Sequence, residues 1–128
     1  MKKIALITTN KILAQSLAVA IEGIPDLEFE LLLLLNSHQA LLDAEIFEID
    51  IALIDVLNND IEEKETSLSF CERLSKSLPN CHLLLLMSQN DRVNRRMATE
   101  AKKKKIIDDF VFYDSSLKYL LAKLTAIG

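Results

Sequence analysis

The chain has 128 residues, of which 50% are hydrophobic and 27% are charged, and its formal net charge is −4. This length fits one compact domain with an ordinary apolar core, and leaves little room for a second domain. The acidic balance argues against a general nucleic-acid binder.

The cysteines and the apolar runs indicate a soluble cytoplasmic protein. Cys71 and Cys81 have neither the spacing of metal ligands nor a CxxC motif, and both lie in apolar surroundings. We interpret them as reduced thiols of an intracellular protein. The apolar run after Met1-Lys-Lys is too short for a secretory signal, and Leu31 to Leu35 are too few to span a membrane.

Apolar runs alternate with amphipathic stretches five times along the chain. The expected strands cover residues 3–8, 28–35, 50–56, 82–87 and 109–112. The expected helices cover residues 12–24, 37–47, 67–78, 91–104 and 116–126. Helical spacing predicts that these helices turn the following residues inward: Leu13, Leu17, Ala20, Ile21 and Ile24; Ala40, Leu41, Ala44 and Phe47; Leu68, Cys71, Leu74 and Leu78; Leu117, Leu120, Leu121 and Leu124.

Strands separated by helices of this length predict parallel strands joined by right-handed crossovers. We expect an α/β fold of the flavodoxin-like (βα)₅ type, a three-layer sandwich around a five-stranded parallel sheet of order 2-1-3-4-5. The expected domain covers residues 1–128. The five leucines of the second strand indicate either burial on both faces or an edge strand partly covered by a neighbouring chain.

Polar residues stand at the ends of four of these strands. They are Thr8, Thr9, Asn10, Asp55, Ser88 and Tyr113. A lone aspartate at a strand end is more often a cap or turn residue. In an open α/β sheet, however, ligands bind beyond the carboxyl ends of the strands, at the switch point between strands one and three. The whole set therefore favours a site centred on Asp55.

This order of a carboxylate, a hydroxyl and a further polar residue on successive strand ends resembles the CheY-like receiver domain of two-component response regulators. The resemblance covers essentially the whole chain. The segment Asp109-Phe-Val-Phe-Tyr-Asp-Ser-Ser-Leu-Lys-Tyr-Leu-Leu121 is most similar to receivers of the NarL/LuxR-type regulators. The resemblance implies that Asp55 is equivalent to the phosphoryl acceptor, Ser88 to the switch hydroxyl and Phe110 to the switch aromatic.

The same positions also depart from the family pattern. Thr8 and Thr9 stand where receivers carry an acidic pair, and Tyr113 stands where they carry a lysine. With Asn10, the threonines offer only neutral oxygens, so Asp55 alone makes a poor site for Mg²⁺, and we expect no cofactor. We expect Tyr113 to hydrogen-bond Asp55, directly or through a water.

These features predict an atypical receiver with a degenerate phosphorylation site, which acts as a signalling or dimerisation module and not as an enzyme. One alternative is a phosphorylatable receiver that uses Asp55 with weak Mg²⁺ binding. An alternative of another class is a flavodoxin-like ligand-binding protein or enzyme. A flavin site needs a glycine-rich loop after the first strand, and the only glycines are Gly23 and Gly128.

The fourth helix is rich in cations. Its basic residues are Arg92, Arg95, Arg96, Lys102, Lys103, Lys104 and Lys105. They form either a solvated helix face or an interaction surface, and Asp108 and Asp109 are candidate ion-pair partners. The resemblance implies a homodimer through the fourth helix, fifth strand and fifth helix. It also implies a sensor kinase and a DNA-binding output domain beyond residue 128 as partners. We expect no direct nucleic-acid or membrane binding by this domain.

Overall fold

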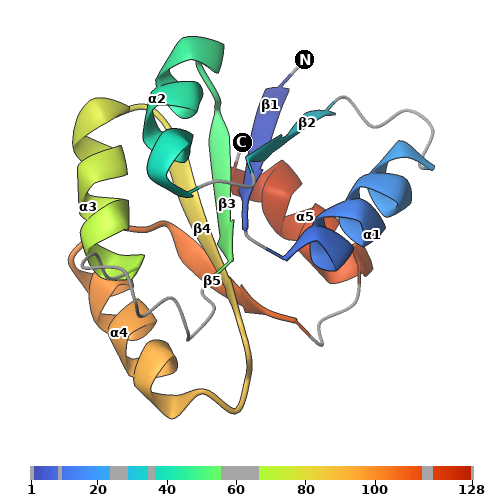
Figure 1. Cartoon of the computed structure of the whole chain (residues 1–128). Coiled ribbons are helices and arrows are strands. Elements are labelled where there is room, and N and C mark those ends of the chain that lie inside the picture. The colour runs from blue at the N-terminus through green and yellow to red at the C-terminus, as the bar shows by residue number, and fades with distance from the viewer. Residues whose placement is uncertain are drawn as a thin grey trace.

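A computed structural model describes residues 2–8, 10–23, 29–34, 37–55, 67–113 and 117–127. The strands form one parallel sheet of order β2-β1-β3-β4-β5, which confirms the predicted topology (Figure 1). The strands are β1 Lys2–Ile7, β2 Phe29–Leu34, β3 Ile51–Asp55, β4 His82–Met87 and β5 Asp109–Phe112. The helices are α1 Lys11–Glu22, α2 Ser37–Phe47, α3 Ser67–Ser77, α4 Arg92–Lys103 and α5 Leu117–Ile127.

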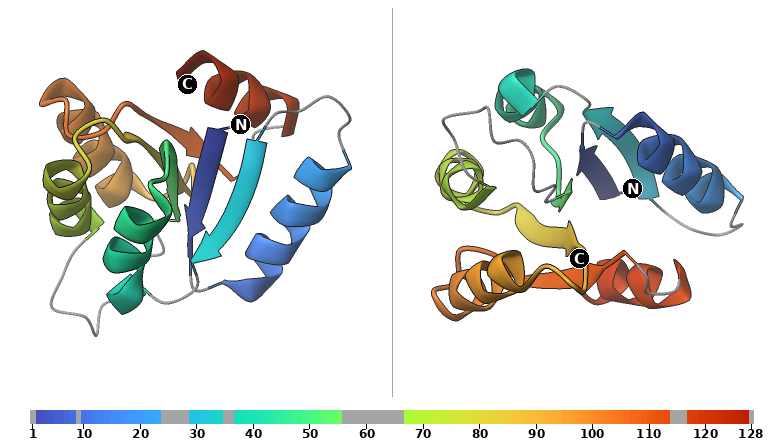
Figure 2. Two further views of the ribbon diagram at one scale, coloured as in Figure 1. Left: turned by 90° about the horizontal axis from the view of Figure 1, so that it is seen from above. Right: turned by 60° about the horizontal axis from the view of Figure 1, so that its bottom comes forward.

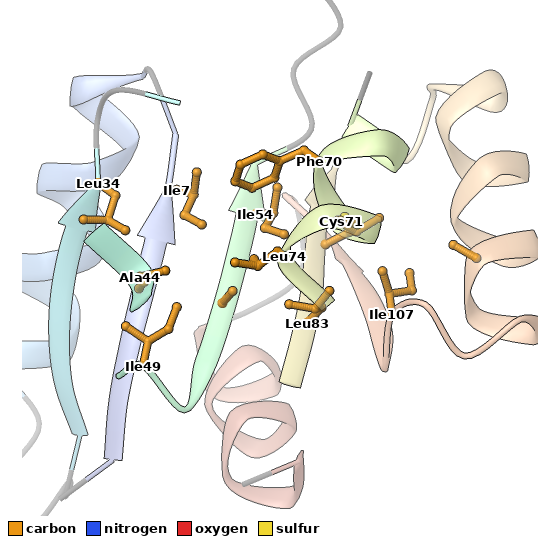
Figure 3. Close-up of a cluster of buried hydrophobic side chains, with 14 of the residues drawn as sticks. Ile7, Leu34, Ala44, Ile49, Ile54, Phe70, Cys71, Leu74, Leu83 and Ile107 are labelled. Carbon is orange, nitrogen blue, oxygen red and sulfur yellow. The ribbon is translucent and has the colours of Figure 1, made fainter. Parts of the chain in front are cut away.

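The central strands are uncharged over most of their length because both of their faces are covered. Helices α2, α3 and α4 lie on one face of the sheet, and α1 and α5 lie on the other (Figures 1 and 2). Successive residues of a strand point to opposite faces. Ile54 therefore belongs to the core beneath α2, α3 and α4, which Figure 3 shows, and its neighbour Leu53 belongs to the core beneath α1 and α5.

The leucine-rich strand β2 lies at the edge of the sheet, which confirms the edge position, while its coverage by a neighbouring chain stays a prediction. Leu34 is buried, whereas Leu33 is 38% exposed. Burial of the whole run on both faces, the other interpretation of the sequence, is therefore wrong for the described residues of β2.

The helical spacing correctly predicts most of the buried helix residues. Those confirmed as buried are Leu17, Ile21, Ala44, Cys71, Leu74, Leu120 and Leu124. The residues found half-buried are Leu13, Ala20, Leu78 and Leu121. The predicted inward side chains of Ile24, Ala40, Leu41, Leu68 and Leu117 lie outside the described part of the structure.

The prediction is wrong at Phe47, which is 43% exposed. Phe47 is the last residue of α2, and Glu48 after it adopts the left-handed conformation with φ of 52°. The chain then turns inward, and Ile49 occupies the core position instead. No helix in the described ranges combines the length and the apolar character that a membrane span needs.

Candidate functional site

The carboxyl ends of the strands bring Thr8, Asp55 and Tyr113 together. β1 and β3 pair in parallel up to Ile7 and Ile54, so Thr8 and Asp55 stand next to each other at the same sheet edge. Tyr113 follows β5, and its backbone N–H donates to the carbonyl of Met87 at 2.9 Å. That bond extends the β4–β5 pairing by one residue and holds the start of the tyrosine side chain over the end of the sheet.

Both oxygens of the Asp55 carboxylate accept hydrogen bonds from neutral hydroxyls. Thr8 Oγ1 donates to Oδ2 at 2.5 Å, and the Tyr113 hydroxyl donates to Oδ1. The direct bond between Tyr113 and Asp55 confirms the hydrogen bond expected from the sequence. Thr8 is 5% exposed and Tyr113 is 37% exposed, so one donor is buried beneath the carboxylate and the other covers it from the solvent side.

The Thr8 hydroxyl also joins the site to the start of α1. The backbone N–H of Asn10 donates to Thr8 Oγ1 at 3.0 Å, and Asn10 Oδ1 accepts from the backbone N–H of Leu13 at 3.1 Å. Asn10 is thus the N-cap of α1. Its side-chain oxygen therefore caps the helix, a role that was not predicted from the sequence. Thr9 lies outside the described residues.

Ser88 follows β4 at the same ends of the strands as Asp55, whereas Phe110 lies near the start of β5. The switch roles that the resemblance implies for these two residues stay predictions. Ser88 is half-buried after β4, and its Oγ accepts from the backbone N–H of Asn90 at 3.3 Å in the turn before α4. Phe110 packs partly buried against the core beneath α2, α3 and α4. Its ring meets the ring of Phe112 edge-on, with 5.9 Å between centroids.

The donor set at these strand ends does not fit a magnesium ion. Mg²⁺ in proteins is held by hard oxygen ligands, usually including carboxylates, in octahedral geometry. Of the described residues that end or directly follow the strands, Asp55 alone carries a carboxylate, and both of its oxygens already accept hydroxyl protons. Elsewhere in the described ranges, no group of three or more His, Cys, Asp or Glu side chains gathers as a metal site.

A second polar cluster lies at the opposite end of β5. Asp109 accepts from Lys102 Nζ of α4 at 3.1 Å and from Lys123 Nζ of α5. Burial raises the pKa of Asp109, but the hydrogen bonds from Lys123, from the Phe110 N–H and from Lys102 outweigh it and hold this pKa below its ordinary value. The hydrogen bond to Asp109 in turn raises the pKa of Lys123.

This cluster confirms the predicted pairing of Asp109 with a cation of the fourth helix. Asp108 does not pair with that helix: its carboxylate accepts from the Leu83 N–H at 2.8 Å and lies 3.4 Å from His82 Nδ1. Lys123 was not predicted from the sequence as a partner of Asp109. The only sequence signal for it is its place between Leu120 and Leu124, which turns a lysine in α5 toward the sheet.

The comparisons with known proteins place the fold among receiver domains. No family model and no curated protein sequence matches the chain. A CheY-like response regulator receiver domain protein from Methanospirillum hungatei JF-1 superimposes with a TM-score of 0.79 at 16% identity, covering 99% of this chain and 93% of that one. The signal receiver domain of an HD domain-containing protein from Pseudomonas fluorescens Pf-5 gives 0.78 at 17% identity, covering 98% and 85%.

An adenylate cyclase structure from Rhodopirellula baltica is also similar, with a TM-score of 0.81 at 16% identity and coverage of 98% of this chain and 85% of that one. At these identities the likeness establishes the fold alone. The chain has the fold of CheY-like receiver domains of response regulators.

Proposed function

We propose that the chain is an atypical receiver domain of a response regulator whose conformation is not set by phosphorylation of Asp55. The observation that carries the proposal is the pair of hydroxyl hydrogen bonds, from Thr8 and Tyr113, to the two oxygens of that carboxylate. Both oxygens of the Asp55 carboxylate therefore have hydrogen-bond partners within the protein when no phosphoryl group is bound.

The chemistry of phosphoryl transfer supports this proposal. The reaction depends on neutralising the charge of the transferred group, usually with a metal ion and a cationic side chain. The two hydroxyls are neutral near pH 7. A carboxylate oxygen that already accepts a hydrogen bond from Tyr113 is also a weaker nucleophile, because the bond stabilises the negative charge on that oxygen.

The rival within the same fold is a receiver that is phosphorylated on Asp55 despite weak metal binding. It is favoured by the position of Asp55 at the end of β3. A structurally similar response regulator from Burkholderia pseudomallei carries a phosphorylated aspartic acid and a calcium ion. Its TM-score is 0.73 at 17% identity, and the match covers 99% of this chain and 72% of that one.

Incubation with acetyl phosphate and Mg²⁺, followed by intact-mass spectrometry, separates the two functions. We expect no phosphate adduct on the native protein. A variant carrying Thr8→Asp and Tyr113→Lys restores an acid and a cation beside Asp55, and its gain of an adduct would show that neutral side chains caused the loss. An adduct on the native protein that disappears in Asp55→Ala would overturn the proposal.

As a module of this kind, the chain acts by binding other proteins and not by catalysis. We infer a cytoplasmic regulator of the NarL/LuxR type, in which residues 1–128 form the receiver domain and an output domain follows. The surface formed by α4, β5 and α5 is the proposed site of homodimerisation and of contact with a sensor kinase or the output domain. Light scattering after size-exclusion chromatography tests the dimer, since a monomer at high protein concentration would contradict it.

A further inference from the structure

Helix α4 presents a face of exposed cations to solvent, in two groups on either side of Thr99. An α-helix turns about 100° per residue, so side chains at three- and four-residue steps share one face. The basic stripe is defined as Arg92, Arg95, Arg96, Lys102 and Lys103, all of which are exposed. Ala98 and Ala101 are buried on the opposite side of α4, against the sheet.

The net charge of residues 92–105, which include the stripe, is opposite in sign to that of the rest of the chain. Residues 92–105 contain seven Lys or Arg and one acidic residue, Glu100, and carry +6. The whole chain has 15 basic and 19 acidic residues, so the remainder has 8 and 18 and carries −10. At physiological salt, charges interact over about 8 Å, so a ligand at the stripe meets a strongly positive surface despite the negative total.

Among the described residues, few acidic side chains pair with the stripe. Lys102 pairs with Asp109, and Lys103 lies 3.9 Å from Glu100 with both side chains more than half exposed. Arg95 donates to the carbonyl of Gln89 at 2.9 Å and forms no ion pair with a described carboxylate. Within the described ranges, no carboxylate lies within 4.0 Å of Arg92 or Arg96.

We propose that the basic stripe docks an acidic segment of another protein, with carboxylates repeating at three- and four-residue steps along about three helical turns. The inference rests on the proposed function as a binding module and names its partner's chemistry. Arg92 and Lys103 are eleven residues apart, about 16 Å along the helix axis. The guanidinium groups at the start of α4 suit carboxylates because they can donate two parallel hydrogen bonds.

The surroundings of the stripe favour an acidic protein over other polyanions. A membrane-bound amphipathic helix inserts its apolar face, whereas the apolar face of α4 packs on the sheet, and Val93 is the one exposed large apolar residue among the residues of this helix. A nucleic acid longer than the stripe would bring its phosphates against the acidic remainder, and α4 offers no aromatic side chain for a base to stack on.

A second copy of the chain is a poor partner for the stripe in a two-fold contact. In a two-fold contact centred on α4, two rows of arginine and lysine would face each other, and like charges placed together weaken such an interface. A homodimer through the α4, β5 and α5 surface therefore needs its axis nearer to β5 and α5, and it leaves the stripe open to the acidic segment.

The test is fluorescence anisotropy with a labelled synthetic peptide of about 15 residues, a length set by the helix rise. Glutamates stand at three- and four-residue steps on a background of alanine and glutamine, and the control peptide has glutamine in place of each glutamate. The full chain is titrated as wild type, as the stripe variant Arg92→Glu/Arg96→Glu and as the matched control Lys11→Glu/Lys76→Glu. Lys11 and Lys76 are exposed and lie outside α4, β5 and α5. Each variant replaces two cations by two glutamates, so both make the same change in net charge.

We expect the glutamate peptide to bind wild type and the control variant alike, and the stripe variant to bind about tenfold more weakly. The glutamine peptide is expected not to bind. Equal weakening in the two variants, or no binding of the glutamate peptide, would overturn the inference. Tighter binding of a DNA duplex or of phosphatidylserine vesicles than of the peptide would also overturn it. Intact mass with acetyl phosphate on the same samples reports the proposed function separately.

Discussion

The substitution Thr8→Val tests whether the buried hydroxyl holds the site together. Valine has nearly the shape of threonine, so the change removes the hydroxyl without opening a cavity. It removes the bond to Asp55, whose acceptor is ionised, and such bonds contribute about 1.5–3 kcal/mol. The hydroxyl also accepts from the Asn10 N–H, but Asn10 is exposed and water replaces that bond. Thr8 is 5% exposed, so water cannot take the place of its hydroxyl at the carboxylate. We therefore expect a loss of about 2–3 kcal/mol.

Urea unfolding followed by circular dichroism measures this loss, and an unchanged slope shows that the two-state comparison holds. The matched control is Thr99→Val in α4. The Thr99 hydroxyl is exposed and donates only to the Arg95 carbonyl at 2.8 Å, so its removal is expected to change the free energy of unfolding by less than about 0.5 kcal/mol. If the two valine variants unfold at the same urea concentration, the hydroxyl of Thr8 does not hold the carboxylate as described.

Three further predictions concern the tyrosine, the ion pair and the thiols. Tyr113→Phe removes the donor that covers the site from the solvent side, and since water can replace it there, urea unfolding should show a smaller loss, about 0.5–1.5 kcal/mol. Lys123→Met should cost about 1 kcal/mol at pH 7. Because the pKa of Asp109 is lowered in the folded protein, its ion pair stabilises the fold above the ordinary pKa of about 3.9, and this contribution is lost as the pH falls through the folded pKa. Unfolding curves of this variant and of wild type should therefore converge below that folded pKa. Burial raises the pKa of Cys71 and of Cys81 to about 12. Iodoacetamide at neutral pH should therefore label both thiols more slowly in the folded protein than in urea. In the folded protein, the half-exposed Cys81 should be labelled before the buried Cys71, as measured by the masses of the modified peptides.

The central strands of the sheet could be predicted from the sequence because burial on both faces produces continuous apolar runs. Strands β3 and β4 read as uncharged runs, and their ends place Asp55 and Ser88 at one sheet edge without any knowledge of side-chain contacts. The hydrogen bond between Tyr113 and Asp55 was predictable for the same reason, since the topology brings both strand ends together and their chemistry is complementary.

Features that depend on where a chain turns were not predictable in this way. Phe47 has the spacing of a buried residue, but α2 ends there and the next core position passes to Ile49. Asn10 has the chemistry of a pocket residue, but its place before α1 makes it a cap. The ion pair between Lys123 and Asp109 depends on how α5 packs against β5, and residue spacing alone does not determine this packing.

In the leucine-rich edge strand β2, different residues contribute to solubility and to folding. Its outer side presents backbone N–H and C=O groups that no strand in the described ranges pairs, and such edges invite pairing with other molecules. Glu30 is the one charge within Phe29–Leu34, it is exposed, and the strand contains no proline. Removing this carboxylate would hardly change the free energy of unfolding, yet it would lower the concentration at which the protein stays dispersed. The charge of Glu30 therefore bears on aggregation, while the buried Leu34 of the same strand contributes to the core.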